Sequence, residues 1–314
     1  MKVLVIGATG AVGLPLVSQL VQRGHEVVGT SRTQERAETL RGLGAEPAVL
    51  DALDREAVRG LVLESRPEAI VHQATSLAGG LDFKRFAETF AQTNRLRTEG
   101  TDNLLSAAKE AGVERFVAQS YSGITYARVG GPVKTEDDPL DDSLPESVQG
   151  TVAAIEHLEA AVLDAGGIAL RYASFYGAAI DPMRDAMRGR KVPIVGDGGG
   201  VWSLVHVDDA AAATVLAIER GASGIYNVAD DEPAPAREVL PAMAEALGSP
   251  PPRKVPPWLA KLFAGELGVI MMTQIRGASN AKAKRELGWT LRYPSWRQGF
   301  PATYGWSLRD ANAA

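Results

Sequence analysis

Short apolar segments alternate with segments of helical pattern along the first half of this 314-residue chain. The apolar segments are nearly continuous, which is typical of strands that are covered on both faces. Alternation of such strands with helices predicts an α/β fold, in which a doubly wound parallel sheet carries helices on each side. The expected strands are residues 2–6, 26–29, 46–50, 69–72, 116–119, 168–171 and 225–228. The expected helices are residues 12–22, 34–40, 55–64, 98–111, 151–163 and 209–219.

The later part of the chain is richer in turn-forming residues. Residues 177–202 include Asp181-Pro182 and a glycine-rich run at 196–200, and prolines cluster at 250–252 and 256–257. Two further helices are expected at residues 258–272 and 280–287, the second ending at Gly288. We therefore predict a sheet domain made of residues 1–176 and 203–231. Residues 177–202 and 232–314 would form a smaller, substrate-binding domain.

Composition excludes several classes of protein. Lys+Arg 33 against Asp+Glu 38 gives a net charge of −5, which argues against a nucleic-acid or anionic-membrane partner. The chain has no cysteine, so disulfides, thiolate metal sites and cysteine nucleophiles are excluded. The four histidines have no metal-ligand spacing, so we expect no metal. The apolar run after Lys2 is too short for a signal or membrane segment, and we expect a cytoplasmic protein that acts on a small molecule.

A glycine motif of the form G-x-x-G-x-x-G directly follows the first expected strand and opens the first helix. Glycine allows the backbone to turn tightly and to approach a pyrophosphate, and the helix start supplies N–H groups for its oxygens. In this position the motif predicts a Rossmann-type dinucleotide site; a tight turn without a ligand is the alternative. The expected contacts in this loop are Gly7, Thr9, Gly10, Ala11, Val12 and Gly13.

The end of the second strand bears on the choice of cofactor. An acidic residue there would favour NAD, whereas an arginine suits the 2′-phosphate of NADP. The chain has Ser31 and Arg32 at this point and Arg36 one turn later, so we predict NADP and keep NAD as the alternative; the arginines would otherwise be solvated surface charges. Asp51, followed by Ala52, ends the third strand and is expected either to accept from the adenine amino group or to cap a helix.

Motifs along nearly the whole chain then suggest a family. Besides the glycine loop and Asp51, they are Val71-His72-Gln73-Ala74, Asn94 with Gly100-Thr101-Asp102-Asn103-Leu104-Leu105, Arg115-Phe116-Val117 before Ser120, Arg171-Tyr172 with Phe175-Tyr176-Gly177, residues 205–210 and residues 283–289. In these motifs the chain resembles the extended short-chain dehydrogenases/reductases, the NAD(P)-dependent epimerase/dehydratase family. The resemblance implies that Gln73, Ala74 and Thr75 line the cofactor and that Ser120 is the catalytic serine.

One departure from the family pattern bears on the chemistry. The resemblance predicts Y-x-x-x-K on the helix before the sixth strand, where the two side chains share one face. Val148 and Val152 occupy these positions, and valine cannot ionise or donate a proton. We therefore expect an atypical member without the usual acid/base pair.

Three residues after the fifth strand are candidates for the catalytic role. Tyr126 is the first choice for a proton donor and Tyr121 the second, and Ser120 could hydrogen-bond a substrate oxygen. Either tyrosine could instead pack the pocket wall. The predicted function is an NAD(P)-dependent oxidoreductase that transfers hydride to or from a small organic substrate. An epimerase or dehydratase and a non-catalytic NADP-binding sensor remain alternatives. The resemblance also favours a homodimer, in which helices 98–111 and 151–163 would form the interface. The second helix carries an apolar stripe, part of which must face the sheet.

Overall fold

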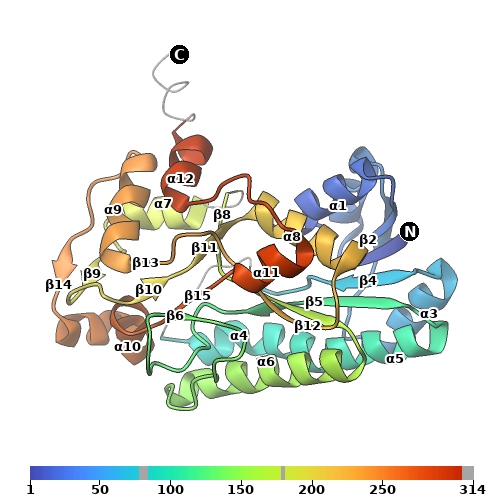
Figure 1. The fold of residues 1–314 in the computed structure, drawn as a ribbon, viewed down its shortest axis with the longest axis horizontal. Coiled ribbons are helices and arrows are strands. Elements are labelled where there is room, and N and C mark those ends of the chain that lie inside the picture. Colours follow the sequence, from blue (N-terminus) through green and yellow to red (C-terminus); the bar gives the residue numbers. More distant parts are fainter. Residues whose placement is uncertain (78–83, 178–180, 306–314) are drawn as a thin grey trace.

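The computed structural model describes residues 1–77, 84–177 and 181–305. Its centre is a seven-stranded sheet in the order β12-β7-β5-β4-β1-β2-β3, with every neighbouring pair parallel (Figure 1). The strands are β1 (Lys2–Ile6), β2 (Glu26–Ser31), β3 (Glu46–Val49), β4 (Ala69–His72), β5 (Arg115–Tyr121), β7 (Ile168–Tyr172) and β12 (Gly224–Val228). The chain leaves β1 toward β2 on one side and toward β4 on the other, so the sheet has a topological switch point between β1 and β4.

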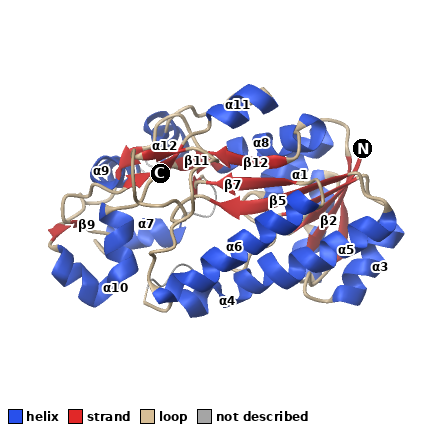
Figure 2. Ribbon diagram, turned by 60° about the horizontal axis from the view of Figure 1, so that its bottom comes forward, coloured by secondary structure: helices blue, strands red, loops and turns tan. Residues whose placement is uncertain are grey.

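Helices cover both faces of this sheet (Figure 2). One face packs against α1 (Gly13–Gln22), α8 (Val207–Arg220) and α11 (Ala281–Leu287), in a core rich in valine and alanine. The other face packs against α3 (Arg55–Ser65), α5 (Thr101–Ala111) and α6 (Glu146–Asp164). A short helix α2 (Gln34–Glu38) and a 3₁₀ turn (Arg41–Leu43) connect β2 to β3. The predicted α/β doubly wound architecture is confirmed.

The C-terminal part of the chain adds helices and short strand pairs at one end of the sheet (Figure 1). Its helices are α7 (Asp181–Arg188), α9 (Ala236–Ala246), α10 (Pro257–Thr273) and α12 (Trp296–Tyr304). The short pairs are β8 (Ser174–Tyr176) with β11 (Leu204–His206), β9 (Ile194–Val195) with β14 (Lys254–Val255), β10 (Val201–Trp202) with β13 (Ala234–Pro235), and β6 (Val133–Lys134) with β15 (Gly277–Ala278). Residues 178–180 and 306–314, which the sequence assigns to the smaller domain, lie outside the described residues.

Several elements differ from their prediction. Helix α6 begins at Glu146 rather than near residue 151, and the helices α4 (Phe86–Arg95), α7, α9 and α12 were not predicted. A π-helical segment, Leu96–Gly100, joins α4 to α5 without a break. Helix α10 is kinked where Gly265 has a φ of +69°. Gly288 does end α11 in the left-handed conformation, as predicted.

The apolar stripe on α6 is buried inside the chain. Val152, Ile155, Leu158 and Val162 are all buried; Val152 belongs to one apolar cluster, and Leu158 and Val162 belong to another. The stripe is therefore accounted for by the chain's own core and gives no support to a homodimer.

Candidate active site

The glycine loop between β1 and α1 is too tightly packed for side chains. Gly7 has a φ of +83°, and a Cβ there would lie 2.8 Å from the backbone of Ala74 at the end of β4. A Cβ on Gly13 would lie 2.4 Å from the carbonyl oxygen of Gly7. The loop is anchored from β2, because Thr30 accepts from the amide of Gly7 through Oγ1 and from the amide of Ala8 through its carbonyl oxygen. These contacts explain why glycine is required at both ends of the motif.

The start of α1 is open to an anion. The N-cap residue, Val12, makes no side-chain cap hydrogen bond, and the first turn contains no acidic residue. Uncapped N–H groups and the positive end of the helix dipole are the features that bind a pyrophosphate. The loop and helix therefore fit a dinucleotide, with Thr9, Gly10 and Ala11 in the turn between the two outer glycines.

The carboxyl end of β2 carries hydroxyl and guanidinium groups. Thr9 Oγ1 lies 3.3 Å from Ser31 Oγ, and Arg36 donates to the carbonyl oxygen of Thr9 at 2.8 Å. Arg32 is exposed beside them, and none of the ion pairs in the described part of the chain uses Arg32 or Arg36. These two arginines, which form no ion pair with a described residue, bring positive charge to this edge of the sheet.

Asp51 does not cap the following helix. Its Oδ1 accepts from the amide of Leu53 at 3.0 Å, whereas Asp54 is the N-cap of α3 and accepts from Ala57. The capping alternative for Asp51 is therefore wrong, and its contact with adenine stays a prediction. The neighbouring Ala52 is buried, and its carbonyl oxygen accepts from Asn103 on α5.

The end of β4 carries two polar side chains with unused atoms. His72 is fully buried with Nε2 3.0 Å from the carbonyl oxygen of Leu96, and burial lowers its pKa to about 4. Gln73 donates to the hydroxyl of Tyr172, and its Oε1 has no hydrogen-bond partner among the described residues. Buried acceptors without partners are rare in native structures, so a ligand atom is a reasonable partner for Gln73. Ala74 and Thr75 follow, both half-buried.

Ser120 lies on β5 beside a buried ion pair. Its hydroxyl donates to Glu159 Oε1 at 2.6 Å, and both carboxylate oxygens of Glu159 accept from Arg171 on β7. The three side chains are at most 5% exposed. The Ser120 proton is therefore engaged within the protein; its predicted contact with substrate remains a prediction.

Tyr126 belongs to the same buried network. Its hydroxyl donates to Asn227 Oδ1 at 2.6 Å and accepts from Arg171 at 3.1 Å. Burial is the main cause that raises the pKa of Tyr126. A hydroxyl with both partners inside the protein and a raised pKa favours a structural role, while the predicted role as proton donor stays a prediction.

Two other hydroxyl groups lie at the end of β5. The side chain of Tyr121 lies against Gly123, where a Cβ would meet its hydroxyl oxygen. Burial raises the pKa of the Tyr121 phenol, although a hydrogen bond with Ser174 and the charge of Arg97 act in the opposite direction. Ser122 is 2% exposed and its Oγ has no partner among the residues that the structure describes. Ser122 was not predicted from the sequence, because the family motif marks only the first serine of the Ser120-Tyr121-Ser122 run.

Val148 and Val152 point into an apolar cluster. Val148 is 0% exposed and Val152 is 8% exposed. Their cluster joins α4, the loop after β5, α6 and the end of α10, and its other buried members are Phe86, Phe90, Ile124, Leu144, Leu267, Ile270 and Ile275. Shifting the spacing by one turn gives Thr151 and Ile155, both buried, and neither ionises near neutral pH. The helix thus offers no acid/base pair in either register.

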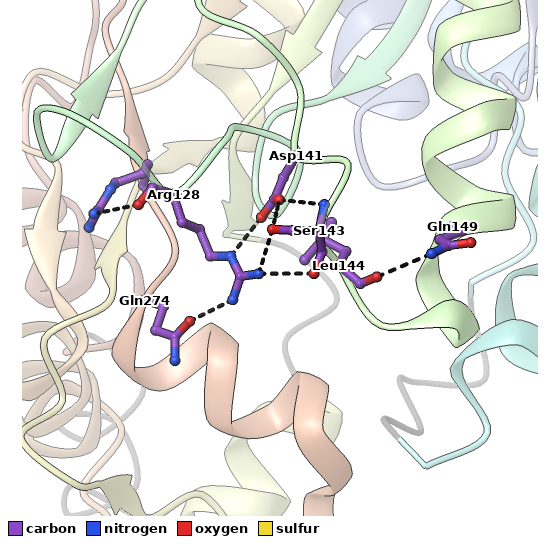
Figure 3. A network of polar contacts seen from close by, with 7 residues as sticks. Arg128, Asp141, Ser143, Leu144, Gln149 and Gln274 are labelled. Carbon is purple, nitrogen blue, oxygen red and sulfur yellow. Dashed lines mark hydrogen bonds and ion pairs between the residues drawn. The ribbon is translucent and has the colours of Figure 1, made fainter.

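A polar network fastens the loop after β5 to the C-terminal region (Figure 3). Arg128 donates to Asp141, to the carbonyl oxygen and hydroxyl of Ser143, and to Gln274 beyond the end of α10. Hydrogen bonds from Ser143 and Arg128 hold the pKa of the buried Asp141 below its usual range. The network fixes the loop that carries Tyr126 against the region that carries Ile270 and Ile275.

The sequence matches the NAD dependent epimerase/dehydratase family over residues 3–229, and the chain belongs to this family. It is 45% identical to a 3-diazoavenalumate denitrifying reductase from a Streptomyces species, over 95% of this chain and 99% of that protein. It is 31% identical to a UDP-glucose 4-epimerase of Mycolicibacterium smegmatis, over 92% of this chain and 93% of that protein.

Solved structures agree with the fold. The UDP-glucose 4-epimerase of Thermotoga maritima, solved with UDP-glucose, superposes with a TM-score of 0.79 at 22% identity, covering 99% of this chain and 100% of that one. The predicted family and Rossmann-type fold are therefore confirmed, and a nicotinamide dinucleotide is the cofactor typical of this family. Within the described residues, no helix is long and apolar enough to span a membrane, and no group of three or more metal-ligating side chains is present.

Proposed function

We propose that this protein is an NADP-dependent reductase that acts on a small organic electrophile whose reduction needs no tyrosine–lysine pair. One observation carries the proposal: both positions of that pair are buried valines in an apolar cluster. The 45% identity to a reductase over almost the entire chain supports the same reaction type.

The missing pair disfavours the epimerase and dehydratase alternative. Both reactions begin with oxidation of an alcohol, for which a base must take the hydroxyl proton. The hydroxyls of Ser120 and Tyr126 already donate to Glu159 and Asn227. An electrophile that gains hydride at carbon and loses a neutral leaving group needs no such base. The diazonium form of a diazo compound is of this kind, because N₂ departs with the electron pair of the C–N bond.

The glycine loop and the start of α1 would hold the pyrophosphate of the cofactor, which supplies a hydride when bound. Ser31, Arg32 and Arg36 would hold the 2′-phosphate, and their position beside Thr9 supports NADP over NAD. Asp51 would accept from the adenine amino group.

The end of β5 would face the reacting groups. Ser122, with an unused buried hydroxyl, would hydrogen-bond the substrate or the nicotinamide amide. Tyr121 would close the pocket above Gly123 and stands before Tyr126 as a donor where a substrate does need a proton. Ser120 would fix this strand to α6 through its hydrogen bond to Glu159.

The function is tested by loss of NADPH absorbance with aryl diazonium, enone, ketone and imine substrates. We expect turnover with at least the diazonium class and release of N₂ in equal amount. Tight NADPH binding with no turnover across the panel would refute the reductase and favour the binding-protein alternative. Net epimerisation of a nucleotide sugar would favour the epimerase alternative.

The cofactor preference is tested by fluorescence titration with NADPH and NADH. Arg32→Ala should weaken NADPH binding by about 1.5–3 kcal/mol, the worth of a hydrogen bond to a charged group, and leave NADH binding unchanged. Arg41→Ala, which removes an exposed arginine paired with Glu38, is the matched control. Equal affinities of the parent protein for NADPH and NADH would contradict the preference.

A further inference from the structure

Arg97 is a buried cation that forms no ion pair with any residue the structure describes, although the charge of Glu159 acts on it from a greater distance. It lies in the π-helical segment between α4 and α5 and is 5% exposed. Among the described residues, its guanidinium donates one hydrogen bond, to Asn94 Oδ1 at 3.4 Å, near the limit for such a bond. None of the ion pairs between described residues includes Arg97. By contrast, the equally buried Arg171 forms an ion pair with Glu159, to whose two carboxylate oxygens it donates.

An unmatched buried charge is costly, because the loss of hydration is not returned by a partner. The local backbone nevertheless turns this side chain inward. In a π-helical turn, the extra residue changes which side chains face the core, and here Leu96, Arg97 and Gly100 are the buried ones. Such turns are frequent at functional sites. A group held in this way is suited to pair with an anion that arrives from outside.

The neighbours of Arg97 place it at the substrate end of the site. Burial raises the pKa of Tyr121 at the end of β5 and lowers the pKa of His72 at the end of β4; the charge of Arg97 acts on both groups, against burial at Tyr121 and with it at His72. The guanidinium lies 5.9 Å from the ring centre of Phe90, which stacks on Phe86 in the cluster that contains Val148 and Val152. The pyrophosphate site lies elsewhere, at the start of α1 after β1. Arg97 thus stands where a cofactor phosphate is not expected and where apolar, aromatic surface begins.

We propose that Arg97 binds the carboxylate of the substrate, and that the substrate is a small flat acid whose apolar body lies toward Phe90 and Tyr121. One guanidinium matches one carboxylate in charge and in its two-pronged geometry. A phosphate would need more positive charge than Arg97 alone supplies. His72 adds none near neutral pH, because burial lowers its pKa to about 4. The inference rests on the proposed function for the position of the pocket, but it concerns binding and can be tested without turnover.

The test measures binding of trans-cinnamate and of its neutral amide, cinnamamide, to the NADP-loaded protein by calorimetry. We expect the wild type to bind the acid at least tenfold more tightly than the amide. Arg97→Met should weaken cinnamate binding about 10- to 100-fold and leave the amide and NADP unchanged. Arg97→Lys, which keeps the charge, should fall between the two. Arg95→Met is the control, because Arg95 is exposed to solvent and forms an ion pair with the exposed Glu99.

Thermal unfolding of the ligand-free protein separates binding from a structural role. If Arg97 awaits a ligand, Arg97→Met removes an unmatched charge and should melt at the same or a higher temperature. Equal wild-type affinity for acid and amide, no binding of cinnamate, or weaker NADP binding by Arg97→Met would overturn the inference. Charge-dependent binding without turnover on any substrate would uphold carboxylate binding by Arg97 and refute the proposed reductase activity. Turnover by the wild type, together with unchanged cinnamate affinity in Arg97→Met, would uphold the reductase activity and refute carboxylate binding by Arg97.

Discussion

Replacement of Tyr126 by phenylalanine separates a structural from a catalytic role for this side chain. The ring is buried, and its hydroxyl is the only part that the change removes. Two partners are affected: Asn227 Oδ1, which accepts at 2.6 Å, and Arg171, which donates at 3.1 Å. Arg171 keeps both bonds to Glu159, so Asn227 carries the larger loss.

The size of the effect follows from these contacts. Asn227 is 0% exposed and its Nδ2 already has no partner among the described residues, so water cannot replace the lost phenol without a rearrangement. A buried polar group left without a partner costs about 1–3 kcal/mol. We therefore expect Tyr126→Phe to lower the free energy of unfolding by about 2 kcal/mol, while turnover of the folded enzyme and NADPH affinity change little.

Urea unfolding and steady-state turnover, measured on the same preparation of Tyr126→Phe and of the parent protein, distinguish the structural from the catalytic role. Tyr226→Phe is the matched control, since its hydroxyl donates to the carbonyl oxygen of Ala222, away from the sheet end that carries the site. Unchanged stability together with a turnover loss of about 10²-fold or more, the range for loss of a general acid, would refute this reasoning and restore Tyr126 as the donor.

Three further predictions concern the core and the assembly. Glu159→Gln leaves the buried Arg171 without its counter-ion and should lower the free energy of unfolding by about 3 kcal/mol; equal denaturation midpoints would contradict this. Burial lowers the pKa of His72 to about 4, whereas an unfolded histidine titrates near about 6.5, so the unfolded state takes up the proton first. Stability should thus be full above pH about 6.5 and fall by up to about 3 kcal/mol toward pH about 4, and His72→Gln should flatten this dependence in urea titrations. The homodimer remains a prediction for light scattering, and a monomer at high micromolar concentration would contradict it.

The sheet could be predicted from the sequence because its strands are nearly all apolar and its turns are marked by glycine. Strands β1 and β4 begin and end at the predicted residues, and the other strands of the large sheet differ by a few residues at most. The helices α4, α9 and α12 were missed for a physical reason. Helix α4 mixes charged and aromatic residues with few aliphatic ones, and α9 and α12 each contain an internal proline, at Pro241 and Pro301, which usually argues against a helix.

The site was less predictable, because spacing along the chain does not reveal which atoms already have partners. Ser120 and Tyr126 carry suitable hydroxyls, but a carboxylate from α6 and an amide from β12 engage them from 39 and 101 residues away. Arg97 was not predicted, because the family motif was placed on Asn94 and on Gly100-Thr101, on either side of it. Asn94 donates to Thr151 on α6.

The valine at position 152 and the arginine at position 97 together decide where positive charge lies near the proposed site. The family pattern puts a lysine on α6, one turn from a tyrosine, so that the cation acts on a phenol of the same helix face. Here Val152 removes that cation, and Arg97 brings one to the site from the segment before α5. The charge of Arg97 reaches Tyr121, whose pKa burial still raises, so it does not activate a phenol as the lysine would. A cation that is not used to deprotonate a hydroxyl is available to hold an anion. Val152 and Arg97 together therefore fit the proposed site, which would hold the carboxylate of an acid while hydride is transferred and would not need to remove a proton from an alcohol.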